Sequence, residues 1–411
     1  MNGSKYAKNE VKMRYDNTQS YTSVNEILAK TLERESISKT EAYELINYNE
    51  NDLIVPLART IRDRNNKSRV ITYSRKVFIN LINLCKDTCS YCTYKKEPYE
   101  RLASMMTPSQ VLTIAELGKK FRCTEALFVT GERPEQKYFE ARDWLRSVGH
   151  TSTVEYIVDM SEKVLQKTGL LPHTNAGSLT KKEMCLLKDT NISLGMMLES
   201  TSERLIGKGM PHEKAPSKNP KVRIKTLEDA GKLKIPFTTG LLIGIGEEPE
   251  ELIDSLFVIK EMHRKYGHIQ EVIIQNFMPK LDTEMAKVAP AKQDYFIKVV
   301  ALARIILQDI NIQVPPNLNP NIFERFLDAG INDWGGVSPI TIDYVNPEFP
   351  WPTIESLKNI TSSKGFLLRA RLPIYPEFLL HKGDSFVSDK LMTHINSICD
   401  ASGLVREDFV N

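Results

Sequence analysis

The pattern of apolar and polar positions changes character near residue 70. Upstream, residues 23–66 carry apolar side chains at spacings of three and four, which predicts three amphipathic helices. Within this stretch Ser38 followed by Glu41 has the form of a capping box, so a helix is expected to begin there. We therefore predict that residues 1–70 form an N-terminal helical extension, in which the polar residues 1–20 are expected to be loose.

Downstream, short apolar runs alternate with helical patterns about eight times. The runs are almost continuously apolar, as expected for parallel strands buried on both faces. Helices are predicted at 107–120, 153–169, 180–189, 222–233, 249–267, 294–309 and 321–330. Strands are predicted at 76–84, 125–131, 170–177, 192–200, 236–246, 271–277, 311–317 and 331–338.

Eight strand–helix units over roughly 260 residues favour an α/β fold of the closed (β/α)8 TIM-barrel type over an open sheet. The barrel is placed at residues 71–338. Residues 339–411 contain proline-rich turns and a short helix, and we expect this C-terminal segment to pack on the barrel.

Charge and apolar content narrow the class of protein. The 55 basic and 52 acidic residues give a net charge of +3, which is too balanced to indicate nucleic acid or an anionic membrane as the main partner. No segment approaches the ~20 apolar residues of a membrane span, and the polar N-terminus has no signal-peptide core. These features predict a cytoplasmic protein.

Three of the six cysteines are close together: Cys85, Cys89 and Cys92 follow the first predicted strand. That end of a barrel strand is where active sites form. Structural zinc sites and ferredoxin clusters use four protein ligands, whereas three thiolates can bind three irons of a cubane and leave the fourth iron open. A zinc site completed from elsewhere, or chance, remains an alternative. The other cysteines are expected to be small buried hydrophobes: Cys123, Cys185 and Cys399.

The loop LCKDTCSYCTYKK, with Tyr91 directly before the last cysteine, resembles the radical S-adenosylmethionine (SAM) superfamily. The resemblance implies a TIM-type barrel and a 4Fe–4S cluster bound by Cys85, Cys89 and Cys92. It also implies that the open iron binds the amino and carboxylate groups of SAM. Reductive cleavage of SAM then yields a 5′-deoxyadenosyl radical, and Tyr91 is expected to contact the cofactor.

Other strand ends resemble further SAM-binding elements of that superfamily. Thr130-Gly131-Glu132 resembles the Gly-Gly-Glu element that contacts the methionine amino group, with Thr130 in place of the first glycine. Glu199 is a candidate to bind the ribose hydroxyls and Arg204 to pair with a carboxylate. Each is equally consistent with an ordinary strand-to-helix turn or a helix cap.

The fifth predicted strand ends in a glycine-containing turn, GLLIGIGE (240–247). It resembles the element that packs on adenine, and backbone contacts are expected at Gly244 and Ile245. As a dinucleotide-binding fingerprint the turn is incomplete. Its glycines are also consistent with a turn that only needs their backbone freedom.

Polar residues at the remaining strand ends are candidates for a substrate pocket, or for partners of buried backbone groups. The candidate substrate contacts are Asn175, Gln275, Asn276, Asn317 and Asn332. The catalytic proton acceptor is not identified, and His173 and Asp333 are weak candidates for it.

Longer stretches, among them TGERPEQKYFEARDWLRSVGH and DAGINDWGGVSP, resemble subunit 1 of the 7,8-didemethyl-8-hydroxy-5-deazariboflavin (FO) synthase family over residues 70–375. The resemblance implies a lyase of coenzyme F420 biosynthesis. It would act on 5-amino-5-(4-hydroxybenzyl)-6-(D-ribitylimino)-5,6-dihydrouracil, closing a ring with loss of ammonia to give FO.

The implied partners are FO synthase subunit 2, which makes this adduct from tyrosine and 5-amino-6-ribitylaminouracil, and an electron donor. With one cysteine loop in this chain, subunit 2 is expected to be a separate protein. Residues 1–70 are longer than expected for subunit 1 and look more like the lead-in of subunit 2. Alternatives are another radical SAM synthase, such as subunit 2 or a menaquinone-pathway type, and a non-catalytic Fe–S or zinc protein.

Overall fold

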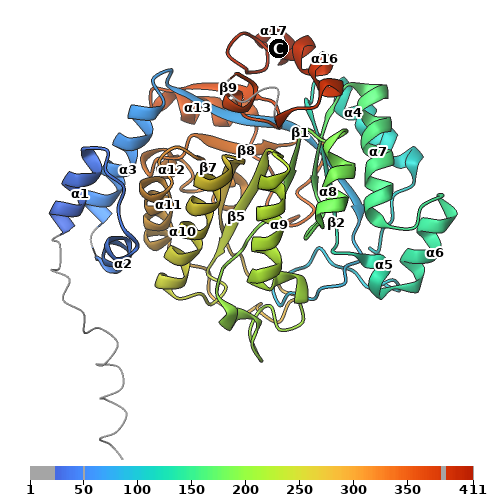
Figure 1. Ribbon diagram of the computed structural model, residues 1–411, viewed down its shortest axis with the longest axis horizontal. Coiled ribbons are helices and arrows are strands. Elements are labelled where there is room, and N and C mark those ends of the chain that lie inside the picture. Colours follow the sequence, from blue (N-terminus) through green and yellow to red (C-terminus); the bar gives the residue numbers. More distant parts are fainter. Residues whose placement is uncertain (1–23, 50, 381–385, 411) are drawn as a thin grey trace, which may run out of the picture.

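The computed structural model describes residues 24–49, 51–380 and 386–410 (Figure 1). Eight parallel strands form a closed barrel, because β1 pairs with β2 along one edge and with β8 along the other. The predicted (β/α)8 barrel is therefore confirmed. The strands are β1 (Val70–Ile82), β2 (Glu125–Thr130), β3 (Leu171–Asn175), β4 (Ser193–Gly195), β5 (Phe237–Ile243), β6 (Ile269–Asn276), β7 (Asn311–Gln313) and β8 (Asp333–Val337).

Helices surround this barrel, and their apolar faces share one core with the outward faces of the strands. Strands β2 and β5 are buried at every position, which explains why their sequences are nearly all apolar. The helices are α4 (Pro108–Lys120), α5 (Pro134–Lys137), α6 (Phe139–Ser147), α7 (Thr153–Thr168), α8 (Lys181–Lys188), α9 (Pro220–Lys232), α10 (Pro249–Tyr266), α11 (Gln293–Ile306) and α12 (Glu324–Asp328). Only α5 and α6, which precede α7 between β2 and β3, were not predicted.

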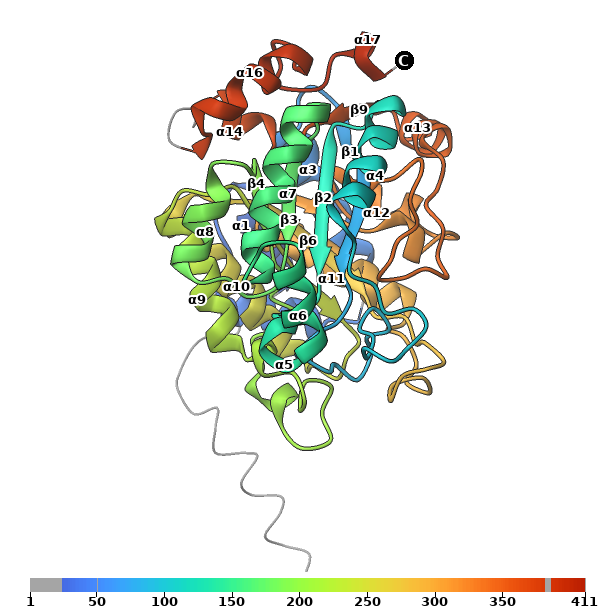
Figure 2. The same cartoon turned by 90° about the vertical axis from the view of Figure 1, so that its right-hand side faces the viewer.

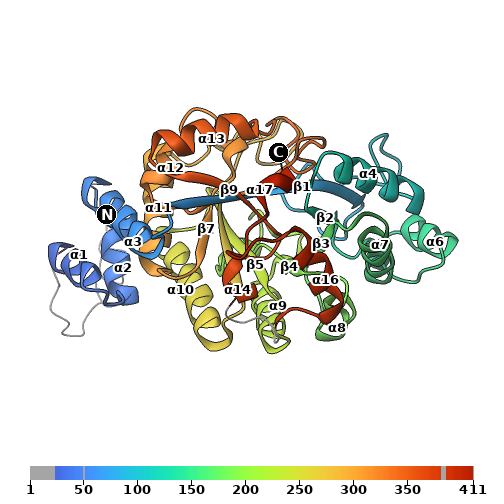
Figure 3. The ribbon, with the colours of Figure 1, turned by 90° about the horizontal axis from the view of Figure 1, so that it is seen from above.

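Three helices precede the barrel: α1 (Val24–Leu32), α2 (Lys39–Asn47) and α3 (Asn51–Asn65). They lie beside α10, α11 and α12 (Figures 1 and 3). The predicted capping box is present: the Ser38 hydroxyl accepts from the Glu41 N–H, and the Glu41 carboxylate accepts from the Ser38 N–H. The prediction for residues 1–20 lies outside the described residues.

A ninth strand, β9 (Leu367–Arg371), was not predicted. It pairs in parallel with residues 70–74 of β1, below the part of β1 that pairs with β2. The elements around it are α13 (Ile354–Ser363), α14 (Pro376–Leu380), α16 (Asp389–Ile398) and α17 (Glu407–Val410). In Figures 1 and 2, α14, α16 and α17 lie over the end of the barrel where the strands begin. The C-terminal segment therefore covers the end opposite to the cysteine loop.

Two smaller predictions have different outcomes. Cys123 is buried as expected, but Cys185 is exposed on α8 and Cys399 is partly exposed, so that prediction is wrong for Cys185. Within residues 24–49, 51–380 and 386–410, no helix has both the length and the apolar composition of a membrane span.

Candidate active site

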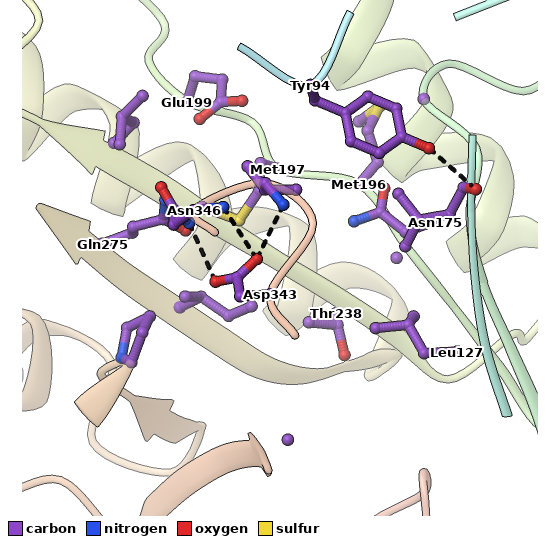
Figure 4. Close-up of a pocket in the computed structure, with 18 of the residues that line it drawn as sticks. Tyr94, Leu127, Asn175, Met196, Met197, Glu199, Thr238, Gln275, Asp343 and Asn346 are labelled. Atoms are coloured by element: carbon purple, nitrogen blue, oxygen red, sulfur yellow. Dashed lines mark hydrogen bonds between the residues drawn. The ribbon is translucent and has the colours of Figure 1, made fainter. Parts of the chain in front are cut away.

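A cavity of about 350 Å³ extends into the barrel from the carboxyl ends of the strands. Every barrel strand contributes lining residues, and so does the segment that follows β8. Figure 4 shows Asn175, Met196 and Gln275 around this cavity, together with Asp343 and Asn346 from that segment. Its place matches the active-site end of other barrels, and its size is typical of a small-molecule site.

The three clustered cysteines all line this cavity. The Cys92 N–H donates to the Cys89 carbonyl at 3.1 Å, which folds the loop back on itself. Burial raises the pKa of both the Cys85 and the Cys89 thiols to about 12. A buried thiolate therefore needs a positive partner in this place, which a metal centre supplies.

Three thiols on one short loop match the ligand set of a 4Fe–4S cluster whose fourth iron stays open. The Glu132 N–H donates to the Cys85 sulfur at 3.2 Å, a contact that stabilises a thiolate.

The end of β2 lies against the cysteine loop, and Gly131 makes this approach possible. A Cβ at residue 131 would collide with the Leu84 carbonyl oxygen and lie 2.8 Å from the Cys85 Cβ. Thr130, Gly131 and Glu132 all line the cavity. A glycine is thus required here by close backbone packing, as the sequence motif suggested.

The carboxylate of Glu132 is held by Ser178 and also lies 3.6 Å from Nε of Arg133. It accepts from the Ser178 N–H at 3.0 Å and from the Ser178 hydroxyl at 2.5 Å. Its position beside the cysteine loop is therefore determined by the turn after β3 as well as by β2.

Tyr91 and Glu199 also line the cavity. Burial raises the pKa of Tyr91 and lowers the pKa of His212 to about 3, so the Tyr91 hydroxyl shares a hydrogen bond with Nε2 of a neutral His212 at 2.9 Å. Glu199 has a φ of 65°, a strained value for a residue with a side chain, and its carboxylate accepts from the Lys218 ammonium.

The predicted cofactor contacts Arg204, Gly244 and Ile245 do not line the cavity. Arg204 is exposed and pairs with Glu251 at 2.8 Å, so its predicted pairing with a ligand carboxylate is not supported. The backbone N–H groups of Gly244 and Ile245 donate to the Glu247 carboxylate at 2.7 and 2.9 Å. Their predicted contact with adenine remains a prediction.

Among the predicted substrate residues, Asn175, Gln275 and Asn276 line the cavity, whereas Asn317 and Asn332 do not. Asn317 donates to Asp343. Asn332 directly precedes β8, and its Oδ1 accepts from Arg304. The sequence pattern placed the start of the last strand at residue 331, but β8 begins at Asp333. Asn332 therefore lies at the opposite end of the barrel from the cysteines.

The two candidate proton acceptors occupy different environments. His173 lines the inner part of the cavity, where burial lowers its pKa to about 4. Asp333 is fully buried below the cavity, where it accepts from Arg371. The candidacy of Asp333 is therefore not supported, because a neighbouring guanidinium already occupies its carboxylate.

Sequence reasoning missed several cavity residues. Lys76, Glu125 and Glu271 are charged residues at the start of the largely apolar predicted strands 76–84, 125–131 and 271–277, and this was the signal that could have identified them. Asp343 and Trp351 also line the cavity, but they come from the segment after β8. No local pattern predicts that this segment returns to the barrel mouth.

Comparison with known proteins gives the class first. The radical SAM superfamily model matches residues 79–259, which contain the cysteine loop and strands β2 to β5. The FeFe-hydrogenase maturase HydG from Carboxydothermus hydrogenoformans has a similar fold, with a TM-score of 0.71 and 19% identity over 84% of this chain and 79% of that one. The fold and the cysteine loop are thus those of a radical SAM protein.

Sequence relatives identify the family more closely. The chain is 50% identical to 7,8-didemethyl-8-hydroxy-5-deazariboflavin synthase of Methanopyrus kandleri over 75% of its own length and 93% of the relative's. Identity to the synthase of the same name from Methanocaldococcus jannaschii is 46%, over 87% of this chain and 98% of the relative. The chain therefore belongs to the 7,8-didemethyl-8-hydroxy-5-deazariboflavin (FO) synthase family. Membership of the radical SAM superfamily implies a 4Fe–4S cluster and SAM as cofactors.

Proposed function

We propose that this protein is the radical SAM enzyme that completes the deazaflavin FO, acting as subunit 1 of FO synthase. The substrate is 5-amino-5-(4-hydroxybenzyl)-6-(D-ribitylimino)-5,6-dihydrouracil. The observation that carries the proposal is the three-cysteine loop at the mouth of the barrel cavity, in a chain whose relatives share up to half of their residues with it.

Residue roles follow from the positions around the cavity. Cys85, Cys89 and Cys92 would each bind one iron of the 4Fe–4S cluster and leave one iron for SAM. When bound, the reduced cluster supplies the electron that cleaves SAM and releases the 5′-deoxyadenosyl radical. Tyr91 and Glu132, which line the cavity beside the loop, would contact the bound SAM.

Two further cavity-lining residues complete the proposed SAM site. The Glu199 carboxylate would accept hydrogen bonds from the ribose hydroxyls. Thr130 would support the close approach of the Gly131 backbone to the ligand. Both lie at strand ends on the same side of the barrel as the cysteines.

The reaction removes ammonia and two hydrogens from the adduct. One hydrogen atom would leave in 5′-deoxyadenosine and the other as a proton, and the bound cluster would accept the electron left over. The amide side chains of Asn175, Gln275 and Asn276 would hydrogen-bond the uracil edge. His173 is the remaining predicted proton acceptor that lines the cavity.

A buried site suits this chemistry because a primary carbon radical removes hydrogen from any nearby donor. The barrel walls and the segment that carries Asp343 and Trp351 surround the cavity and limit the entry of water. FO synthase subunit 2 would supply the adduct, and a separate electron donor would reduce the cluster.

Anaerobic turnover tests the proposal. The protein is reconstituted with iron and sulfide, reduced, and mixed with SAM and the adduct, and the products are separated by chromatography. Formation of both 5′-deoxyadenosine and fluorescent FO is the expected result. Formation of 5′-deoxyadenosine without FO would mean that the protein catalyses another radical SAM reaction, on a different substrate. Neither product from a preparation with an intact cluster would favour a non-catalytic iron–sulfur protein.

A further inference from the structure

The inner part of the cavity differs chemically from the part beside the cysteines. We call the inner part the lower half of the cavity, and six polar side chains from the strands define it. They are Lys76, Glu125, His173, Thr238, Glu271 and Gln313. The density of hydrogen-bonding groups here is high for the inside of a barrel, which is ordinarily filled by branched apolar side chains.

The lower half is closed at its inner end by the C-terminal segment. Arg371 extends from β9 into the barrel and donates to Asp333 at 2.6 Å and to Glu271 at 3.0 Å. The Pro373 carbonyl beside it accepts from the Ser193 hydroxyl. The groups that make this floor are paired with one another, so a ligand in the lower half meets a closed end.

Lys76 is the one cation of the lower half. Gly336 leaves space for it, because a Cβ at that position would collide with the Lys76 side chain. Its ammonium lies 5.5 Å from the centre of the Phe78 ring and 5.3 Å from that of Trp351. It makes no hydrogen bond or ion pair with the described residues. Burial lowers the pKa of Lys76, and the negative charge of Glu125 across the cavity partly offsets that effect. An ammonium in this place needs an oxygen acceptor, which a ligand supplies.

Gln313 gives a second, independent indication of a ligand. Its side chain is 6% exposed, lines the cavity, and makes no hydrogen bond with the part of the chain that the structure describes. A buried amide with two donors and one acceptor oxygen rarely remains without partners. It lies on β7, on a different strand from Lys76, so the two orphan groups face one cavity from separate walls.

His173 offers an acceptor to the same space. Ser193 has one hydroxyl proton and donates it to the Pro373 carbonyl, so it accepts from His173 Nδ1 at 2.6 Å. The proton of the neutral ring is therefore on Nδ1, and Nε2 is an acceptor. A Cβ at residue 195 would lie 2.8 Å from Nε2, so Gly195 leaves that nitrogen accessible.

The charges exclude an anionic ligand. Lys76 and Arg371 are outnumbered by the carboxylates of Glu125, Glu271 and Asp333, two of which already neutralise Arg371. A phosphate placed here would face these carboxylates at short range in a medium of low dielectric constant. A neutral chain with alternating hydroxyl donors and acceptors meets no such repulsion.

We propose that the lower half of the cavity binds the ribityl chain of the substrate, with Lys76 and Gln313 as direct contacts, and that it selects the neutral chain over its phosphate ester. The proposal rests on the proposed function, which supplies a substrate with such a chain. It orients the substrate with the ribityl chain toward Arg371 and the hydroxybenzyl and uracil rings toward the cysteine loop.

The test compares three adducts in the wild-type protein and in three variants: Lys76→Met, Gln313→Leu and a control. The adducts carry the ribityl group, a methyl group in its place, or ribityl 5′-phosphate, and the readout is kcat/KM for the fluorescent deazaflavin. The wild type is expected to favour the ribityl adduct over the methyl adduct by about a hundredfold, and Lys76→Met to reduce that ratio at least tenfold. The phosphorylated adduct is expected to react at least tenfold more slowly than the ribityl adduct.

Lys298→Met is the matched control. Lys298 is a buried lysine, 8% exposed, whose ammonium donates to the Tyr48 carbonyl outside the barrel. It is expected to keep the wild-type ratio between ribityl and methyl adducts. If Lys76→Met does not assemble the cluster, Gln313→Leu takes its place with the same expected loss of preference.

Each contrary outcome has one meaning. FO formation by the wild type with equal rates for ribityl and methyl adducts overturns the placement of the chain and leaves the proposed function intact. An unchanged preference in both Lys76→Met and Gln313→Leu overturns it too, as does equal use of the phosphorylated adduct. SAM cleavage without any deazaflavin from the ribityl adduct overturns the proposed function itself, and this proposal with it.

Discussion

The two ends of the barrel are both rich in polar residues, but those residues have different partners. At the end where the strands begin, Arg371, Asp333 and Glu271 hydrogen-bond one another and are almost fully buried. At the mouth, Cys85 and Cys92 face a cavity and have few partners of their own. At the strand beginnings the charged groups neutralise one another, whereas at the mouth the three thiols face the cavity, so pairing within the protein separates the floor of the barrel from the cysteine site.

Replacing a cysteine at the mouth of the barrel is expected to reduce activity more than any other change. Cys89→Ala removes a proposed iron ligand, so we expect loss of the cluster and at least a thousandfold fall in SAM cleavage, with little change in the secondary structure. Iron content and 5′-deoxyadenosine formation measure it. Cys185→Ala, at an exposed cysteine on α8, is the control and is expected to behave as the wild type. A Cys89→Ala protein with full activity would contradict the site.

The next effect is at the opposite end and concerns stability. Arg371→Met leaves the buried carboxylates of Asp333 and Glu271 without their cation, which is expected to cost about 3–5 kcal/mol of unfolding free energy. Denaturant unfolding of the two proteins measures it. Arg325→Met removes an exposed pair with Asp294 and is expected to cost less than about 1 kcal/mol. If both variants lost the same free energy of unfolding, the buried ion pairs of Arg371 would not stabilise the closed inner end of the barrel.

Gly131→Ala tests whether the close packing of β2 against the cysteine loop is needed for activity. The added Cβ collides with the Leu84 carbonyl, so β2 and the cysteine loop must move apart. We expect SAM cleavage to fall at least tenfold, because catalytic geometry tolerates shifts of well under 1 Å. Gly149→Ala, where a Cβ meets no neighbouring atom, is the control for backbone strain, since Gly149 has a φ of 88°. If both variants cleaved SAM at similar rates, the position of the cysteine loop would not depend on the missing side chain at Gly131.

Protonation of His173 is expected to make the free energy of unfolding depend on pH, and this is a small effect. Burial lowers the pKa of His173 to about 4, below the ordinary value of 6.5, so the unfolded chain binds the proton more tightly than the folded one. The stability from the neutral ring is therefore complete above about pH 6.5 and is lost as the pH falls toward 4. By pH 5 the loss is about 1–2 kcal/mol.

Unfolding free energies at pH 7 and pH 5 measure this change. His173→Gln is expected to reduce the difference between the two pH values by that amount. A variant with the same pH dependence as the wild type would show that His173 titrates normally in the folded protein.

Much of the fold was predictable because its signals are local. The apolar runs of β2 and β5 and the periodic helices between them are set by burial on both faces of the strands, which any eightfold alternation requires. The predictions failed where an element has no local signal. Strand β9 forms only because its residues meet the free lower edge of β1, and α5 and α6 are short helices in a connection.

The candidate site divides in the same way. The cysteine spacing and the Thr130-Gly131-Glu132 motif are contiguous, so the sequence alone indicated residues that the fold then brought to one cavity. Asn332 and Asp333 look equally suitable in sequence. They lie at the opposite end of the barrel because both stand where the last strand begins, as the predicted range 331–338 already implied.

The class of fold, the cysteine loop and the family could be inferred from the amino-acid sequence, since these depend on residue types at fixed spacings along the chain. Which polar side chains lack a protein partner depends instead on how the chain folds. Lys76 and Gln313 face the cavity because β1 and β7 turn them inward, while Arg371 is neutralised by two carboxylates from β6 and β8. The physical reason is that hydrogen bonds and ion pairs depend on distances between residues far apart in the chain, and folding alone sets those distances.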